Sequence, residues 1–189
     1  MNVTADLVHE HNAILVALDI LDRICDRVDA GQEFPARDAG RIVDFLKNFA
    51  DGCHHAKEEE HLFPALREAG LPAEGGPVGV MLAEHELGRK YIREMVAALG
   101  TEMAPAAPAQ FARSARAYAN LLRAHIGKEN TVLFPMAERF IPARAQARIQ
   151  EAFVRLEEEK TGPGVHERYH AMLRELSGLY ATPEVHHAD

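Results

Sequence analysis

Apolar residues recur along this chain at spacings of three and four residues, and no segment shows the strict alternation of a half-buried strand. The pattern therefore predicts helices throughout. We expect the first helix to begin at the capping residue Thr4 and to end before Gly31, and the second to begin near Pro35 or Asp38. Pro64 is expected to kink or end the second helix, because a proline inside a helix removes a backbone hydrogen bond.

The second half of the chain follows a similar plan. A turn at residues 74–77 precedes a third predicted helix, and a loop rich in alanine and proline, at 100–108, precedes a fourth. Two further helical stretches are expected at 142–160 and at about 165–180. The expected organisation is a duplicated helical bundle at 1–141, a helical extension packed on the same domain at 142–181 and a disordered tail at 182–189.

One motif occurs twice, with copies 71 residues apart. In the first copy His54 and Glu58 stand four residues apart and are followed by Leu-Phe-Pro, and in the second His125 and Glu129 have the same spacing and the same following residues. Side chains four residues apart on a helix lie on one face, so each copy aims an imidazole and a carboxylate at the same point. A Glu-His pair precedes each copy, namely Glu10-His11 and Glu84-His85.

Several of these ionisable residues fall on the apolar stripes, where side chains face the core. A buried ionisable group is costly unless it is paired or bound to a metal. Four predicted helices each place a histidine at mid-height, which favours a four-helix bundle with a metal site between its helices. Four nitrogens and two carboxylates suffice for a pair of iron-like ions. The predicted metal ligands are His11, His54, Glu58, His85, His125 and Glu129.

Composition narrows the possible functions. The 189 residues are 47% hydrophobic and 26% charged, which suits one domain with a sizeable core. A net charge of −8 argues against a nucleic-acid partner, and no run approaches the roughly 18 apolar residues of a membrane span. The first residues lack the basic start and apolar stretch of a secretory signal, so a cytoplasmic location is expected. Cys25 and Cys53 are expected to be free core thiols.

The combination of both Glu-His pairs, both His-x-x-x-Glu motifs and the Leu-Phe-Pro segments resembles the hemerythrin-like HHE cation-binding family, over roughly residues 5–140. The resemblance implies an all-α fold, an up-down-up-down four-helix bundle with extra C-terminal helices. It also implies two non-haem iron ions bridged by carboxylates. Carried over residue by residue, it makes His11, His54, His85 and His125 the terminal ligands and Glu58 and Glu129 the bridges.

The chain departs from the oxygen-carrying members at one position. Those proteins have a fifth histidine from an H-x-x-x-H motif on the third helix, whereas here Arg89 stands four residues after His85 and Met81 four residues before it. A missing nitrogen leaves more open positions on iron and argues against reversible oxygen carriage. The possible replacements are His55, Glu10, Glu84 or a tyrosine.

Sequence position favours other roles for most of these candidates. His55 lies about 100° around an ideal helix from His54, which favours an orienting or solvated position over ligation. Glu59 is expected on a charged surface face. Glu10 and Glu84 could each orient a neighbouring imidazole. Tyr118 is expected to pack in the core with a bonded hydroxyl, with proton or electron donation to the pocket as the alternative.

Three functions fit these features. The first is a di-iron protein that binds or reduces dioxygen, peroxide or nitric oxide, and whether it turns over as an enzyme is left open. The second is an iron or oxygen sensor or store without turnover, in which the C-terminal helices act as a relay. The third is a zinc-bound or metal-free structural protein, which six convergent ligands disfavour because zinc prefers four. No membrane partner is expected, and a protein partner is left open.

Overall fold

The computed structural model describes residues 3–72, 75–100, 104–160, 162 and 164–181. No strand occurs in these ranges, which confirms the all-α prediction. The α-helices and π-helices (η) are α1 (Ala5–Asp29), α2 (Ala36–Phe45), η1 (Leu46–His55), η2 (Glu58–Leu62), α3 (Phe63–Glu68), α4 (Pro77–Gly100), α5 (Ala107–Lys128), η3 (Glu129–Leu133), α6 (Phe134–Phe140), α7 (Ala143–Lys160) and α8 (Val165–Leu179).

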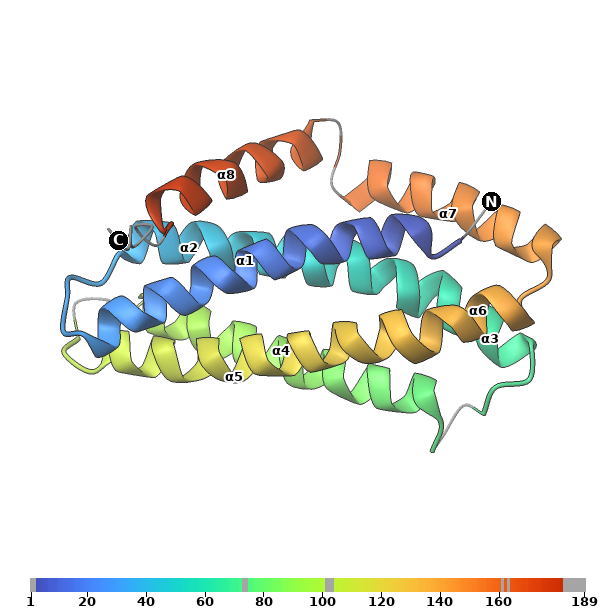
Figure 1. Ribbon diagram of the computed structural model, residues 1–189, viewed down its shortest axis with the longest axis horizontal. Coiled ribbons are helices and arrows are strands. Elements are labelled where there is room, and N and C mark those ends of the chain that lie inside the picture. Colours follow the sequence, from blue (N-terminus) through green and yellow to red (C-terminus); the bar gives the residue numbers. More distant parts are fainter. Residues whose placement is uncertain (1–2, 73–74, 101–103, 161, 163, 182–189) are drawn as a thin grey trace, which may run out of the picture.

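These elements form four long rods that run alternately up and down, as predicted (Figure 1). The first rod is α1, the second runs from α2 through η1 and η2 to α3, the third is α4, and the fourth runs from α5 through η3 to α6. Helices α7 and α8 lie along the side of the bundle formed by the first two rods: α8 contacts α1, and α7 contacts η1 and η2. The predicted tail at 182–189 lies outside the described residues.

The apolar core is divided into two clusters along the bundle axis. One contains residues such as Leu18 and Phe111, and the other, at the opposite end, contains Phe63 and Phe134. A layer of buried polar side chains lies between them on every rod. Its fully or almost fully buried members are His11, His54, His55, Lys57, Glu58, His85, His125 and Glu129.

Pro64 was expected to kink or end the second helix, and it does not end it. Helical structure continues through α3 to Glu68, and the turn before the proline is a π-helix in which the Phe63 amide donates to the Glu58 carbonyl, five residues back. Because proline has no amide hydrogen, a wider turn accommodates it without ending the rod. The fourth rod repeats this device, with the Phe134 amide donating to Glu129.

The π-helix η1 has no counterpart in the second half of the chain. Residues 71 positions later belong to α5, which is regular α-helix. Gly52 suits this turn, because a Cβ there would lie 3.3 Å from the Lys47 carbonyl oxygen. The duplication is therefore broken at η1.

Other local expectations are modified in detail. The predicted loop at 100–108 is shorter, since α4 includes Gly100 and α5 begins at Ala107, with 101–103 outside the described ranges. Thr4 flanks α1, but its hydroxyl donates to Glu138 at 2.6 Å and does not cap the helix.

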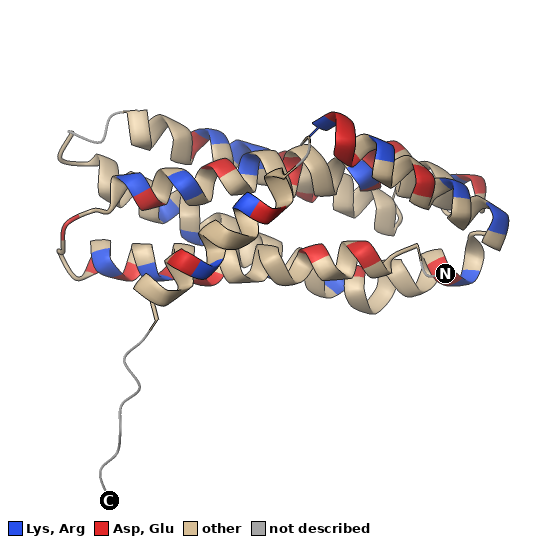
Figure 2. Cartoon of the chain, turned by 90° about the horizontal axis from the view of Figure 1, so that it is seen from above, with Lys and Arg blue, Asp and Glu red and all other residues tan. Residues whose placement is uncertain are grey.

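The outer surface mixes charges of both signs. Figure 2 shows acidic and basic residues interspersed along the helices, and many form ion pairs, such as Arg123 with Asp19 and Asp22 at 2.7 and 2.8 Å. Within the described part of the chain, none of the helices combines the length and hydrophobicity that crossing a membrane requires.

Candidate metal centre

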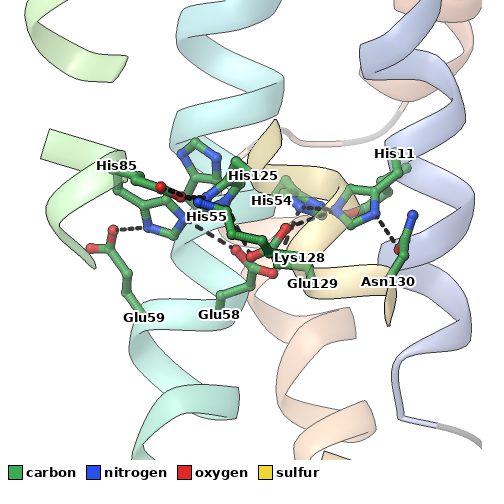
Figure 3. Close-up of polar contacts among 12 residues, drawn as sticks. His11, His54, His55, Glu58, Glu59, His85, His125, Lys128, Glu129 and Asn130 are labelled. Carbon is green, nitrogen blue, oxygen red and sulfur yellow. Dashed lines mark hydrogen bonds and ion pairs between the residues drawn. The ribbon is translucent and has the colours of Figure 1, made fainter. Parts of the chain in front are cut away.

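Two groups of potential ligand atoms meet in the buried polar layer. In each group the ligand atoms lie within 4.8 Å of one another. Figure 3 shows Glu58 and Glu129 between the histidines of the two groups. The first group is His11, His54, Glu58 and Glu129, and the second is His55, Glu58, His85 and His125. All six sequence-predicted residues thus come together, Glu58 belongs to both groups, and His55 joins them.

Of the two positions expected for His55, orienting or solvated, the solvated one is wrong. Its side chain is buried, and its ring stacks on that of His85 with a centroid distance of 3.8 Å. The expectation assumed α-helical rotation per residue, whereas His55 lies at the end of η1, whose wider turn brings two consecutive residues onto the core side. Two features of the sequence could have indicated this placement: His54 and His55 are adjacent, and Arg89 stands where the fifth histidine was expected.

Each histidine is oriented by a hydrogen bond from its Nδ1 atom. His54 donates to Glu10 at 2.7 Å, and His125 donates to Glu84 at 2.9 Å. The remaining donors have other partners: His85 to Glu59 at 2.6 Å, His11 to Asn130 at 2.9 Å and His55 to Asp51 at 3.3 Å. With Nδ1 protonated, a neutral imidazole presents its Nε2 lone pair to the centre, as metal-ligating histidines do.

The spacing of the Nε2 atoms fits a pair of metal ions. The Nε2 atoms of His11 and His54 are 3.1 Å apart, and so are those of His85 and His125. Two such lone pairs repel each other unless a proton or cation lies between them. Two nitrogens bound to one metal at about 2.1 Å and a right angle are about 3.0 Å apart.

Unpaired polar atoms point to the same conclusion. Among the described residues, both carboxylate oxygens of Glu58 and Glu129 and the Nε2 atom of His55 are buried without a hydrogen bond. Glu129 does lie close to imidazoles, at 3.2 Å from His11 and 3.1 Å from His125, but without hydrogen-bond geometry. Bare buried carboxylates are costly, and cations bound between them would remove that cost. The residues therefore fit two metal ions.

In the metal-free protein, the pKa values of the two central carboxylates are shifted in opposite directions. Burial and the charge of Glu129 raise the pKa of Glu58 well above its usual value. Burial alone would also raise the pKa of Glu129, but its contacts with His11 and His125 lower it. Burial and the neighbouring His85 lower the pKa of His55 well below its usual value, which keeps that imidazole neutral and available as a ligand.

Arg89 occupies the position of the expected fifth histidine and has a different role. Its Nε donates to Asp51 at 2.8 Å, and one terminal nitrogen donates to Glu59 at 2.7 Å. These carboxylates accept hydrogen bonds from His55 and His85. Glu59, expected on a charged surface face, is partly exposed but also orients His85, and Arg89 is a clamp on two residues that orient imidazoles.

The other alternative ligands do not join the two groups. Glu10 and Glu84 each accept a hydrogen bond from a histidine of another rod, so they orient ligands. The Tyr118 ring is fully buried, as expected. The prediction that its hydroxyl forms a hydrogen bond was wrong, since the hydroxyl has no partner in the described ranges. Cys25 and Cys53 are free and buried, as predicted, and burial raises the pKa of each thiol to about 12.

Comparison with known proteins agrees with this geometry. The model of the family described as the hemerythrin HHE cation binding domain matches residues 2–137. Uncharacterized proteins from Mycobacterium bovis and from two strains of Mycobacterium tuberculosis are each 28% identical to this chain over 132 residues. The match covers 69% of this chain and 51% of each relative, so the chain spans about half the length of these curated relatives. No solved structure matches at a comparable level of significance.

Proposed function

The chain belongs to the hemerythrin HHE cation-binding domain family, and from that premise we propose that it is a non-haem di-iron protein that binds or reduces a small oxidant. The candidate oxidants are dioxygen, peroxide and nitric oxide. The observation that carries the proposal is the convergence of five imidazoles and two carboxylates in a buried layer, with lone pairs directed inward. Mixed nitrogen and carboxylate ligands suit iron, and seven donors exceed the four that a single zinc ion prefers.

The two proposed iron positions differ in their ligands. One would be held by His55, His85 and His125 and the other by His11 and His54, with Glu58 and Glu129 shared between them. Bound iron would supply a reversible change of oxidation state and an exchangeable coordination position. The position with two histidines has the fewer protein donors, so we assign oxidant binding to that side.

His55 would supply the fifth nitrogen whose absence argued against reversible oxygen binding. That argument depended on the absence of a fifth nitrogen from the third helix. In this chain the fifth nitrogen comes from η1 on the second rod, while Arg89 on the third rod supports it through Asp51. We therefore include reversible dioxygen binding among the proposed activities.

Aromatic rings shield the centre from bulk water. Phe134 stacks on His11 with a centroid distance of 5.4 Å, and Phe63 stacks on His85 at 5.8 Å. An apolar wall of this kind favours neutral diatomic ligands over larger polar ones and strengthens electrostatic interactions inside the site.

The proposal is tested by expressing the full chain with added iron and measuring metal content, then recording visible absorption before and after adding dioxygen, peroxide or nitric oxide. We expect two iron ions per chain and a charge-transfer band that changes with the oxidant. Protein that takes up zinc alone, or iron-loaded protein whose spectrum is indifferent to all three oxidants, would contradict the proposal.

Sensing or storage without turnover is the second candidate function. It is favoured by the contact between α7, which lies beyond the family match, and Lys57 beside the centre. Repeated addition of oxidant and reductant distinguishes oxidant reduction from sensing or storage: a centre that reduces its oxidant consumes more oxidant than it has iron, whereas a sensor or store consumes no more than its iron content.

A further inference from the structure

A buried ammonium group connects the C-terminal helices to the candidate metal centre. Lys57 is almost completely buried, and its Nζ atom donates to Glu10 of α1 at 2.5 Å and to Glu157 of α7 at 2.9 Å. The other carboxylate oxygen of Glu10 accepts the 2.7 Å hydrogen bond from His54. A continuous series of contacts therefore runs from α7 to an imidazole of the centre.

Helix α7 also covers this lysine with apolar surface and continues the series to α8. The Phe153 ring lies 5.9 Å from the Lys57 ammonium group. The second oxygen of Glu157 lies 3.3 Å from Nε2 of His166, whose ring packs against Phe49 of η1 at a centroid distance of 4.9 Å. Both C-terminal helices thus contact the segment that carries His54 and His55.

The duplicated half provides an internal comparison. Lys128 is the counterpart of Lys57 and pairs with Glu84, which accepts the hydrogen bond from His125. The Lys128 side chain is 41% exposed, however, whereas that of Lys57 is 2% exposed. The bundle motif thus leaves Lys128 partly exposed, whereas its counterpart Lys57 is buried and contacts Phe153 and Glu157 of α7.

We propose that the C-terminal extension is a working part of the metal centre, with Glu157 as a positioning residue that acts on His54 through Lys57 and Glu10. The inference rests on the proposed function in that His54 is taken as a ligand. Lys57 lies between Glu157 and Glu10 and fixes the position of the Glu10 carboxylate, whose other oxygen accepts the hydrogen bond that orients His54. By thermodynamic reciprocity, metal bound at His54 strengthens the docking of α7.

The test compares Glu157→Gln with Glu158→Gln in the full-length, iron-loaded protein. Both substitutions remove one negative charge from α7, but Glu158 is exposed. We expect Glu157→Gln to release iron to a chelator about 10-fold faster, because Lys57 then holds Glu10, the partner that orients His54, less firmly. Glu158→Gln should release iron at the wild-type rate. Equal release rates for the two variants would overturn the proposal.

Hydrogen exchange of the wild-type protein provides a readout that needs no variant. Residues 143–160 should exchange more slowly when iron is bound, and Glu157→Gln should abolish that difference. Exchange in α7 that is indifferent to iron would contradict the coupling. Failure of the wild type to bind iron would remove the proposed function itself, whereas iron-loaded protein with an unresponsive α7 would remove only this inference.

Discussion

His54 and His55 are adjacent in the chain, yet both imidazoles face the same buried layer. Adjacent residues on an α-helix diverge by about 100°, so one of the two would normally leave the site. The arrangement persists because each ring also has a hydrogen-bond acceptor on its outer side, Glu10 for His54 and Asp51 for His55. At the residue scale, the centre is therefore defined as much by these acceptors as by the inward-facing nitrogens.

Substitution of His55 tests the fifth nitrogen. His55→Leu replaces the imidazole with an apolar side chain of moderate volume and removes the donor, so the position shared with His85 and His125 loses one of its three histidines. We expect bound iron to fall from two ions per chain toward one, measured by elemental analysis. His9→Ala removes an exposed histidine from α1 and should retain both ions. A His55→Leu protein with a full iron complement would contradict the assignment.

Arg89 can be tested through the geometry of its guanidinium group. Lys at this position retains the charge but cannot reach Asp51 and Glu59 with the two separate donors that Arg89 uses. Arg89→Lys should weaken iron binding about 10-fold, measured by competition with a chelator, because His55 and His85 lose their fixed orientation. Arg93→Lys, an exposed change one turn further along α4, serves as the control. Equal iron affinity in the two variants would contradict the proposed role of Arg89 in fixing Asp51 and Glu59.

The lowered pKa of His55 predicts the direction in which the unfolding free energy of the metal-free protein changes with pH. Burial and the neighbouring His85 lower its pKa in the folded state well below 6.5, whereas the unfolded chain binds a proton near pH 6.5. Below that pH the unfolded state holds more protons, so acidification favours unfolding by up to about 1.4 kcal/mol per pH unit. Between pH 7.5 and 5.5, the unfolding free energy of apo wild type should therefore decrease relative to that of apo His55→Leu. Parallel pH profiles from denaturant melts would contradict the shift.

At the scale of elements, the second rod must satisfy two requirements at once. Its first part buries residues such as Phe45 and Phe49 in one core cluster, and its second part directs His54 and Glu58 to the centre. A regular α-helix with this sequence would rotate one set away from the bundle interior. The π-helix η1 corrects the register between the two parts.

Removing one residue from η1 should therefore leave the apolar residues of the second rod buried but turn its metal-ligand candidates away from the centre. Deletion of Gly52 returns the segment to α-helical spacing and rotates the histidines relative to the apolar residues before them. We expect the helical circular dichroism signal to remain and most of the bound iron to be lost. Deletion of Glu33, in the exposed connection between α1 and α2, is the matched control and should retain iron. A Gly52 deletion that binds iron normally would refute the role of η1.

At the scale of the whole molecule, the polar layer separates two apolar clusters that must be held together. Without cations, the buried carboxylates of Glu58 and Glu129, which have no hydrogen bonds among the described residues, destabilise the middle of the bundle. Metal bound only to the folded state stabilises it by mass action. Stability and metal occupancy are thus expected to change together.

Removal of iron by a chelator tests this coupling. A ligand present at about 100 times its Kd adds about 2.7 kcal/mol, which for a chain of this size corresponds to a rise in Tm of about 5–10 °C. We expect a loss of that order on chelation and its recovery when ferrous iron is added back, followed by calorimetry. Magnesium, which prefers oxygen ligands, should not restore the Tm. A Tm that does not respond to chelation of iron-loaded protein would show that the polar layer is stable without cations.

Periodicity and motif spacing predicted much of the fold and part of the candidate site. The apolar stripes predicted the four rods and the extra helices, because burial imposes a local pattern that can be counted along the chain. The duplicated His-x-x-x-Glu motif predicted which side chains would meet, because spacing of four is a property of a single helix. The π-helices were not predicted, since the hydrogen-bonding pattern that distinguishes them from α-helix leaves no comparable periodic signal.

By itself the sequence determined that the chain is helical, that it is duplicated and that its core contains paired imidazoles and carboxylates. The helical character and the imidazole–carboxylate pairs follow from spacing within single helices, and the duplication follows from comparing two segments of the chain 71 positions apart. Tertiary packing was needed to place His55 at the centre, Arg89 on its two acceptors and Glu157 on Lys57. Those contacts depend on helix pitch and on residues as far as 100 positions apart, and packing, not local spacing, determines which of them meet.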